Sequence, residues 1–283
     1  MSALPDISLA GRVAFVTGAA RGQGRSHAVR MAEEGADIIA VDICEDIESV
    51  TAYDLATEAD LAETVKLVEA LDRRIVAEKA DVRDIEALTA AVERGVAQLG
   101  RLDIIVANAG IFSHAPESHN YGEQAWADVL DVNLTGVWHS VKAAMPHVLA
   151  AGPGGSVILI SSLAGTKGLA SLASYTAAKH GVVGLMKVLA NEYGQHGIRV
   201  NTINPNAIGT TMVQNETLYR IFRPELESPT LEDALPAFAG MNPFKIPFID
   251  PVHVSNAVVF LASDESLYVS GAQLPVDAAA AIA

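Results

Sequence analysis

Short apolar runs alternate with longer stretches of helical pattern along most of this chain. The runs are rich in β-branched residues and bounded by turn residues, which is typical of strands buried on both faces of a parallel sheet. They predict strands at 12–16, 36–41, 75–77, 102–107, 156–160 and 198–203. The stretches between them predict helices over 22–34, 57–73, 84–98, 123–149, 174–195 and 251–263. This alternation predicts an α/β protein with a doubly wound parallel sheet and helices on both faces.

Residues 1–283 are expected to form one domain, because a chain of this length with 50% apolar residues can bury one large core. A formal net charge of −15 makes the chain a poor partner for nucleic acid, whose phosphates are bound by Lys and Arg. The single cysteine, Cys44, excludes an internal disulfide and a cysteine-rich zinc site. The eight histidines show no metal-binding spacing, so no metal site is expected.

No targeting or membrane segment is expected in this chain. Residues 1–10 contain neither a basic region nor a long apolar stretch, so they do not resemble a secretory signal. No run approaches the roughly 18–20 apolar residues that a membrane-spanning helix needs. We therefore expect a cytoplasmic protein with no membrane partner.

Two segments depart from the regular alternation. The connection at 43–74 is long, and it is expected to be partly helical because apolar residues share one face at Leu61, Val65, Val68 and Leu71. The segment 211–248 contains five prolines among many apolar residues, so it cannot form one long helix. We interpret it as a lid over an apolar ligand. The alternative is an irregular loop that packs on the core.

A glycine-rich turn follows the first predicted strand and precedes a predicted helix. Residues 17–24 read TGAARGQG, with Gly18, Gly22 and Gly24 flanking Arg21 and Gln23. Glycines permit a tight turn and a close approach of the backbone, so that a pyrophosphate can bind the free N–H groups of the helix N-terminus. In this context of strand, turn, helix and strand, the motif predicts dinucleotide binding.

Asp42 ends the second predicted strand, where a carboxylate accepts hydrogen bonds from the adenosine ribose hydroxyls. Its charge would repel a 2′-phosphate, which favours NAD over NADP. Arg21 instead favours NADP, because its guanidinium could pair with that phosphate. A second interpretation of Asp42 is that it only caps the following turn.

Ser162, Tyr175 and Lys179 form the most specific pattern in the chain. Tyr175 and Lys179 are one helical turn apart and share a face. A tyrosine with a pKa of about 10 is a poor base at neutral pH. A neighbouring ammonium and a positively charged nicotinamide would both lower that pKa. Ser162 follows a predicted strand, at the edge of the sheet where ligands of open α/β sheets bind, and its hydroxyl can hold a substrate oxygen beside the tyrosine.

These motifs together resemble the short-chain dehydrogenase/reductase family. They are the glycine turn, NAG at 108–110, NLTG at 133–136, Ser162 and the YxxxK pattern at 175–179, and the similarity runs from about residue 11 to 277. The resemblance implies a single Rossmann-type domain and hydride transfer at an alcohol or carbonyl carbon. It also implies a homotetramer, as is usual in the family.

The resemblance assigns roles residue by residue. Tyr175 is the acid/base, Ser162 orients the substrate oxygen, Lys179 lowers the tyrosine pKa and holds the nicotinamide ribose, and Asn133 positions a proton-relaying water. The expected cofactor contacts are Asp81 and Val82 at the adenine, Asn108, Ala109 and Gly110 under the cofactor, and Pro205, Ile208 and Thr210 in the segment that reaches the carboxamide. Asn206 stands after Pro205, where the family commonly has glycine.

A narrower resemblance, to the mycofactocin-associated subgroup that includes carveol dehydrogenases, rests on residues 18–27, 41–44, 177–183, 219–224 and the long connection. It implies that NAD is held firmly and that electrons leave through an external redox carrier. The expected activity is NAD-dependent oxidation of an apolar secondary alcohol, such as a cyclic terpenoid, to the ketone. Two alternatives stay open: an NADPH-dependent carbonyl reductase of the 3-oxoacyl type, and an NAD-sensing scaffold without catalysis.

Overall fold

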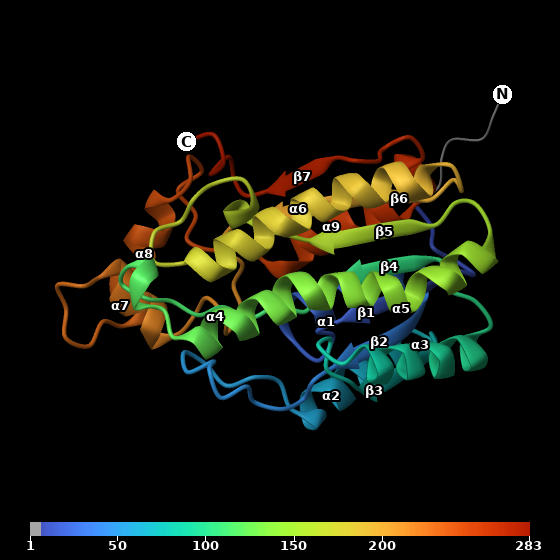
Figure 1. Ribbon diagram of the computed structural model, residues 1–283, viewed down its shortest axis with the longest axis horizontal. Helices are drawn as coiled ribbons and strands as arrows, with labels where there is room; N and C mark the ends of the chain where they lie inside the picture. The colour runs from blue at the N-terminus through green and yellow to red at the C-terminus, as the bar shows by residue number, and fades with distance from the viewer. Residues whose placement is uncertain (1–6) are drawn as a thin grey trace.

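A seven-stranded sheet runs through the centre of the molecule, and all its strands are parallel. The computed structural model describes residues 7–283. The strand order is β3-β2-β1-β4-β5-β6-β7 (Figure 1). The strands are β1 (Val13–Thr17), β2 (Asp37–Asp42), β3 (Ile75–Lys79), β4 (Ile104–Ala107), β5 (Ser156–Ile160), β6 (Arg199–Pro205) and β7 (Gln273–Val276). All six predicted strands are confirmed within two residues of the expected bounds.

The seventh strand, β7, was not predicted from the sequence. It is an edge strand of four residues in which exposed and half-buried positions alternate, and it contains Pro275. Proline is tolerated there because the other side of an edge strand has no neighbour to pair with. Such a strand lacks the continuous apolar run that identified the other six.

Helices cover both faces of the sheet, which confirms the predicted α/β doubly wound fold. One face is covered by α1 (Gly22–Glu33), α2 (Glu58–Glu69) and α9 (Pro251–Ala262). The other is covered by α3 (Ile85–Leu99), α5 (Gly136–Ala151) and α6 (Ala173–Gly194). Successive strand residues point to opposite faces, so Phe15 packs in one buried cluster and Val16 in the other.

The predicted helix at 123–149 is interrupted. It comprises α4 (Glu123–Leu130), a single π-helical turn η2 (Asp131–Thr135) and α5. A π-turn inserts one residue into the helical repeat and is often found at functional sites. Here the turn contains Asn133, one of the predicted site residues.

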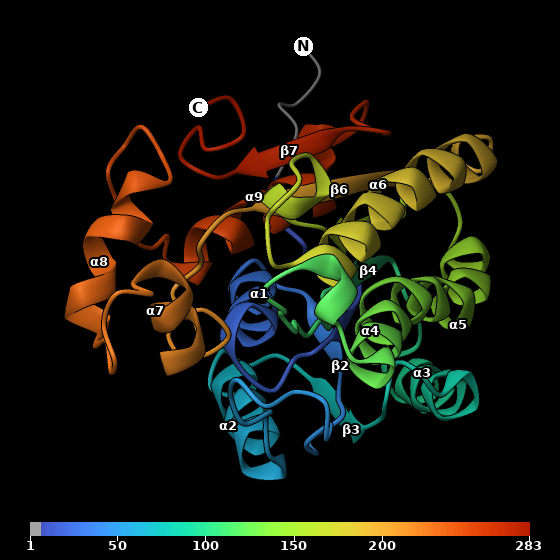
Figure 2. The same cartoon turned by 60° about the vertical axis from the view of Figure 1, so that its left-hand side comes forward.

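The 211–248 segment forms two short helices, α7 (Glu216–Phe222) and α8 (Leu231–Gly240). They pack on each other through a separate buried cluster that includes Tyr219, Ala234 and Phe238. Both lie beyond the end of the sheet toward which the strands point (Figures 1 and 2). Three shorter 3₁₀ turns complete the chain: η1 (Ser118–Asn120), η3 (Leu163–Gly165) and η4 (Asp264–Ser266).

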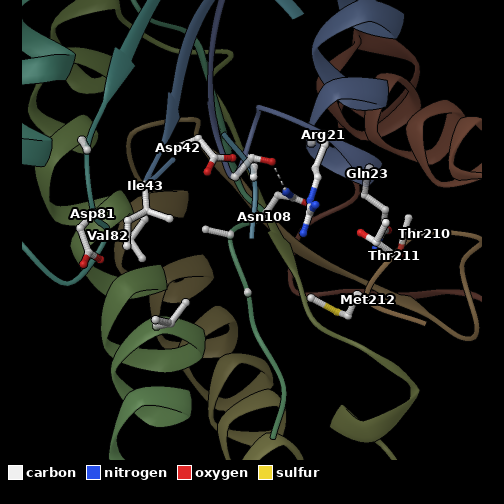
Figure 3. Close-up of a pocket in the computed structure, with 18 residues that line it drawn as sticks. Arg21, Gln23, Asp42, Ile43, Asp81, Val82, Asn108, Thr210, Thr211 and Met212 are labelled. Carbon is white, nitrogen blue, oxygen red and sulfur yellow. Dashed lines mark hydrogen bonds between the residues drawn. The ribbon is translucent and has the colours of Figure 1, made fainter. Parts of the chain in front are cut away.

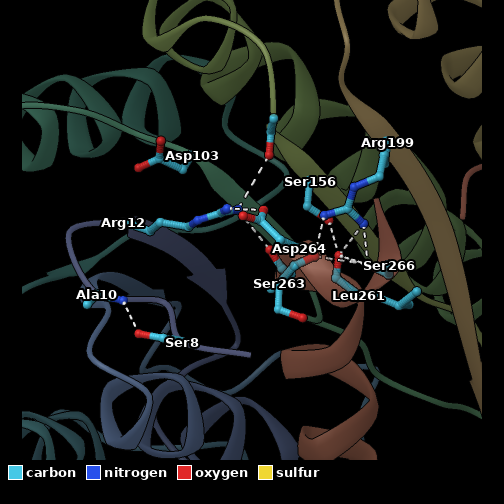
Figure 4. Close-up of polar contacts among 12 residues, drawn as sticks. Ser8, Ala10, Arg12, Asp103, Ser156, Arg199, Leu261, Ser263, Asp264 and Ser266 are labelled. Carbon is cyan, nitrogen blue, oxygen red and sulfur yellow. Dashed lines mark hydrogen bonds and ion pairs between the residues drawn. The ribbon is translucent and has the colours of Figure 1, made fainter. Parts of the chain in front are cut away.

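At the opposite end of the sheet, the buried Arg199 holds the C-terminus of α9 against β6 (Figure 4). Its guanidinium donates to the carbonyls of Leu261 at 2.5 Å and Ser263 at 3.1 Å and to the Ser266 hydroxyl at 2.6 Å. The Leu261 carbonyl, in the last turn of α9, has no backbone partner within the helix, and a cation is favourable at this end of the helix dipole. Burial lowers the pKa of Arg199 to about 10.

The expectation about a secretory signal in residues 1–10 falls partly on residues 1–6, which lie outside the described residues. Within residues 7–283, no helix has both the length and the apolar character needed to cross a bilayer.

Candidate functional site

The strand order reverses direction between β1 and β4, and this is where a crevice opens at the carboxyl ends of the strands. Asn108 joins the two strand ends. Its side-chain amide donates to the carbonyl of Thr17 at 2.9 Å, and its backbone N–H donates to the Thr17 hydroxyl at 3.0 Å. The mouth of the crevice is therefore held in one geometry by side-chain bonds between the segments that line it.

The glycine turn packs too closely for side chains. A Cβ atom on Gly24 would lie 1.9 Å from the carbonyl oxygen of Gly18, and one on Gly18 would lie 2.9 Å from the Cα of Ala109. Gly18 also has a φ of +66°, in the left-handed region. The backbone of the turn and the start of α1 can consequently come close to a ligand.

The start of α1 offers unused hydrogen-bonding groups to such a ligand. Arg21, the residue that precedes the helix, provides no side-chain cap for the helix N–H groups. The buried Oε1 atom of Gln23 also has no hydrogen-bond partner within the described structure, and as an acceptor it is open to a donor group of a ligand but not to its phosphates. Free N–H groups at a helix N-terminus bind phosphate. The turn therefore fits the pyrophosphate of a dinucleotide.

A cavity with a mixed polar and apolar lining, referred to below as the polar cavity, lies over this turn and gathers most of the predicted cofactor residues (Figure 3). In the figure Asp42, Asp81 and Val82 lie on one side, and Gln23 and Thr210 on the other. The predicted residues that line it are Gly18, Arg21, Gly22, Gln23, Gly24, Asp42, Asp81, Val82, Asn108, Ala109, Gly110 and Thr210.

Some lining residues were missed and some predicted residues lie elsewhere. The lining also includes Ile43, Ala56, Ala80, Val132, Thr211 and Met212. Of these, only Ile43 could have been found from the sequence, because it follows Asp42. Pro205 ends β6, and Ile208 is buried and forms a bridge with Ile249. Neither Pro205 nor Ile208 lines the cavity.

Asp42 is buried at the end of β2, where its carboxylate binds two backbone amides. It accepts from the N–H of Ala20 at 2.9 Å and from that of Cys44 at 3.2 Å. Burial raises the pKa of Asp42, and these hydrogen bonds oppose the shift. The carboxylate thus caps the neighbouring turns, as the second interpretation expected, and it also lines the cavity. Its hydrogen bonds to a ribose stay a prediction.

Arg21 is directed toward the long connection. Its guanidinium donates to the backbone carbonyl of Asp54. The side chain lines both the polar cavity and a neighbouring polar hollow formed with residues of 51–54 and 211–220. Arg21 therefore ties the connection to the glycine turn.

Ser162 and Tyr175 line a second cavity, which is mainly apolar. Ser162 lies two residues after β5, and Tyr175 lies in the first turn of α6. Lys179 is one turn further along α6, with its Nζ 5.6 Å from the centre of the Tyr175 ring. The Nζ donates to the carbonyl of Ile160 at 2.8 Å. The three predicted residues are thus brought together.

Burial dominates the electrostatics of this group. It raises the pKa of Tyr175, while a hydrogen bond with the Ser162 side chain opposes the rise. It also lowers the pKa of Lys179 to about 8, so that the ammonium is still largely protonated at pH 7. In the protein alone, burial therefore outweighs the lowering of the tyrosine pKa that was expected from Lys179. That lowering would also require the positive charge of a nicotinamide.

Asn133 is fully buried in the π-turn and clamps the backbone after β4. Its Oδ1 accepts from the N–H of Ile111 at 2.8 Å, and its Nδ2 donates to the carbonyl of the same residue at 2.7 Å. A Cβ on Gly110 would lie 3.4 Å from this Oδ1 and 3.6 Å from the Nζ of Lys179. Asn133 thus fixes the chain beside Lys179. The relay of protons through a water at Asn133 stays a prediction.

The two cavities adjoin, and the 211–248 segment supplies much of the apolar one. Met212 lines both cavities. Further along the segment, the residues that line the apolar cavity are Val213, Leu218, Ile221, Phe222, Phe238 and Met241. The side chains of this segment are therefore arranged around the space beside Ser162 and Tyr175.

Comparison with known proteins places this geometry in a family. The family model described as short chain dehydrogenase matches residues 12–219. The chain is 53% identical over 268 residues to the (-)-trans-carveol dehydrogenase of Rhodococcus erythropolis, covering 95% of this chain and 96% of the relative.

Solved structures agree with the sequence comparison. The crystal structure of carveol dehydrogenase from Mycobacterium avium in complex with NAD has a TM-score of 0.95 and 55% identity, covering 97% of this chain and 99% of that one. A short chain dehydrogenase from Mycobacterium paratuberculosis bound to NAD has a TM-score of 0.87 and 46% identity, with coverages of 97% and 99%. With a family model that matches most of its length and full-length relatives of this similarity, the chain belongs to the short-chain dehydrogenase family.

Proposed function

We propose that this protein is an NAD-dependent alcohol dehydrogenase that oxidises an apolar cyclic secondary alcohol, of the terpenoid type, to the ketone. The observation that carries the proposal is the position of Ser162 and Tyr175 in the apolar cavity, next to the polar cavity over the glycine turn. Lys179 lies within 5.6 Å of the Tyr175 ring centre. Proton transfer can therefore occur where a bound dinucleotide and an apolar alcohol meet.

The chemistry that NAD supplies when bound is acceptance of a hydride from the carbinol carbon. Tyr175, as a phenolate, takes the proton of the alcohol hydroxyl. Ser162 holds the same oxygen and fixes its distance from the tyrosine. Lys179 contributes a buried positive charge that favours the phenolate, while its bond to the Ile160 carbonyl fixes its position.

The preference for NAD rests on the two charged groups near the adenosine end. Asp42 lines the cavity with a carboxylate that would face a 2′-phosphate. Arg21, whose charge would favour NADP, is instead hydrogen-bonded to the carbonyl of Asp54. Close relatives support this assignment, since two solved relatives are described as NAD complexes. A 3-oxoacyl reductase using NADPH is correspondingly disfavoured.

The substrate class rests on the apolar lining and on the relatives. The cavity beside Tyr175 is lined by aliphatic and aromatic side chains such as Leu218, Phe222 and Phe238. Relatives that are 53% and 55% identical are described as carveol dehydrogenases. In this proposal α7 and α8 act as a lid over the alcohol.

Firm retention of NAD is part of the proposal and rests on the 43–57 connection. Arg21 ties it to the glycine turn through Asp54. Five residues before Asp54, Ser49 donates to the carboxylate of Asp128 at 2.7 Å, and Arg83 binds the same carboxylate at 2.9 Å. Because the connection is held at these two points, it slows cofactor release. An external carrier such as mycofactocin would then reoxidise the cofactor in place. We further propose that the protein forms a homotetramer and acts in the cytoplasm.

Replacing Tyr175 with Phe is expected to lower turnover by about a hundredfold to ten-thousandfold, the usual contribution of a general base. NAD binding should persist, because the ring remains. Steady-state oxidation of cyclic secondary alcohols measures the first effect, and NAD titration measures the second. Tyr193→Phe, at the other end of α6, is the matched control. Retained turnover in Tyr175→Phe would show that the tyrosine is not the base.

Absence of turnover by the folded, NAD-loaded wild type on a broad panel of alcohols and ketones would favour the NAD-sensing scaffold.

Replacing Lys179 with Met is expected to move the acidic limb of the pH–rate profile for oxidation upward by about one pH unit or more. The sign follows from the charge: a cation favours the phenolate, so its loss raises the pKa of Tyr175 and the base becomes available only at higher pH. The profile is measured at saturating NAD. Lys187→Met, an exposed lysine on the same helix, should leave the limb in place. An unshifted limb in Lys179→Met would contradict the electrostatic role.

Replacing Asp42 with Ala is expected to raise the affinity for NADP relative to NAD by at least about tenfold, because contact between like charges costs several kcal/mol. Equilibrium titration of both dinucleotides tests this. The exposed Glu45, three residues further on, provides the control variant Glu45→Ala. A wild-type preference for NADP would overturn the choice of cofactor.

Protein purified through gel filtration is expected to release NAD when it is denatured. Arg21→Ala, which removes the tie to Asp54, should lose the dinucleotide faster during the same procedure. Arg30→Ala lies on the same helix outside the cavity and serves as the control. The retained dinucleotide is identified by mass spectrometry. Complete loss from the wild type, with free turnover on added NAD, would refute retention.

A further inference from the structure

Tyr53 extends from the 43–57 connection to the edge of the substrate cavity. Its ring stacks on that of Phe112, with 5.4 Å between the ring centres and 19° between the planes. Its hydroxyl accepts a long hydrogen bond of 3.4 Å from the N–H of Phe112. The segment that covers the cofactor cavity is thereby packed against the chain that follows β4.

The stacked pair separates two hollows of different character. Phe112 lines the apolar cavity together with Ser162 and Tyr175. Tyr53 lines the polar hollow on the other side, together with Arg21 and Arg220. Since each ring borders one hollow and the rings are in contact, the pair is the partition between them.

Hydrogen bonds of the neighbouring residues fix the position of Tyr53 between the two hollows. The carbonyl of the next residue, Asp54, accepts from Arg21. The N–H of Leu55 donates to the carboxylate of Asp46 at 2.8 Å, which closes the loop on itself. Phe112 is only 5% exposed, and the Tyr53 ring that stacks on it is one of the groups that bury it. Burial raises the pKa of Tyr53, and its hydroxyl is neutral at physiological pH.

We propose that Tyr53 is a specificity-determining residue, which limits the size of the alcohol by supporting Phe112 and by closing the apolar cavity toward the polar hollow. This inference rests on the proposed alcohol dehydrogenase activity. Tyr53 does not itself line the apolar cavity, so it acts through Phe112 as a positioning residue. In this proposal the 43–57 connection both covers the bound cofactor and limits the space available to the substrate.

The test compares cyclohexanol with 4-tert-butylcyclohexanol at saturating NAD in wild type, Tyr53→Ala and Tyr53→Phe. Removing the ring is expected to raise the ratio of kcat/KM for the bulky over the small alcohol about tenfold, mainly through KM, as pocket changes of this size do. Tyr53→Phe keeps the stack, so its ratio should stay within about twofold of wild type. Tyr268→Ala removes a tyrosine that is 95% exposed and should leave the ratio unchanged.

An unchanged ratio in folded Tyr53→Ala would overturn the proposal, and so would an equal shift in Tyr53→Phe. If Tyr53→Ala does not fold, Tyr53→Leu is used in its place, and the ratio of kcat/KM is expected to rise in the same direction by a smaller factor. If the wild type oxidises neither alcohol, the proposed function is at fault. The partition is then judged by calorimetric binding of cyclohexanone and 4-tert-butylcyclohexanone, where the same shift in the affinity ratio supports it and no shift refutes it.

Discussion

The contact between the glycine turn and the end of β4 is the constraint on which the rest of the site depends. Gly24 lies so close to Gly18 that a single methyl group would overlap the carbonyl oxygen at 1.9 Å. Asn108 then binds the backbone of Thr17 from the neighbouring strand. This packing brings the start of α1, with its free N–H groups, to the crevice where the strand order reverses.

A second constraint is the removal of water from the reacting groups. Lys179 is buried and Tyr175 is half-buried, and loss of water contacts disfavours the charged form of each. Their bonds to Ser162 and to the Ile160 carbonyl oppose this cost only in part. A positively charged ligand beside them would favour the phenolate strongly, because electrostatic interactions are stronger where the local dielectric constant is low. The protonation of the pair is therefore sensitive to any charge placed beside it.

The 43–57 connection joins parts of the site that are far apart in sequence. It contacts the glycine turn through Arg21, α4 through Ser49 and Asp128, and the chain after β4 through Tyr53 and Phe112. Each contact is modest, but together they fix a segment that has little regular structure of its own. The segment that borders the cavity over the glycine turn through Ile43 and Ala56 and the ring that stacks on Phe112 consequently belong to one structural unit.

The sequence by itself determined six of the seven strands, the parallel character of the sheet, the glycine turn and the shared helical face of Tyr175 and Lys179. These features depend on local patterns: runs of buried strand, glycines that no side chain can replace, and a helical spacing of four residues. Only the tertiary structure showed β7, the π-turn at Asn133, the bond from Arg21 to Asp54 and the stack of Tyr53 on Phe112. Those features arise between segments distant along the chain, or from a single residue inserted in a regular helix. Their energies come from packing and desolvation in three dimensions, which no local pattern of residues encodes.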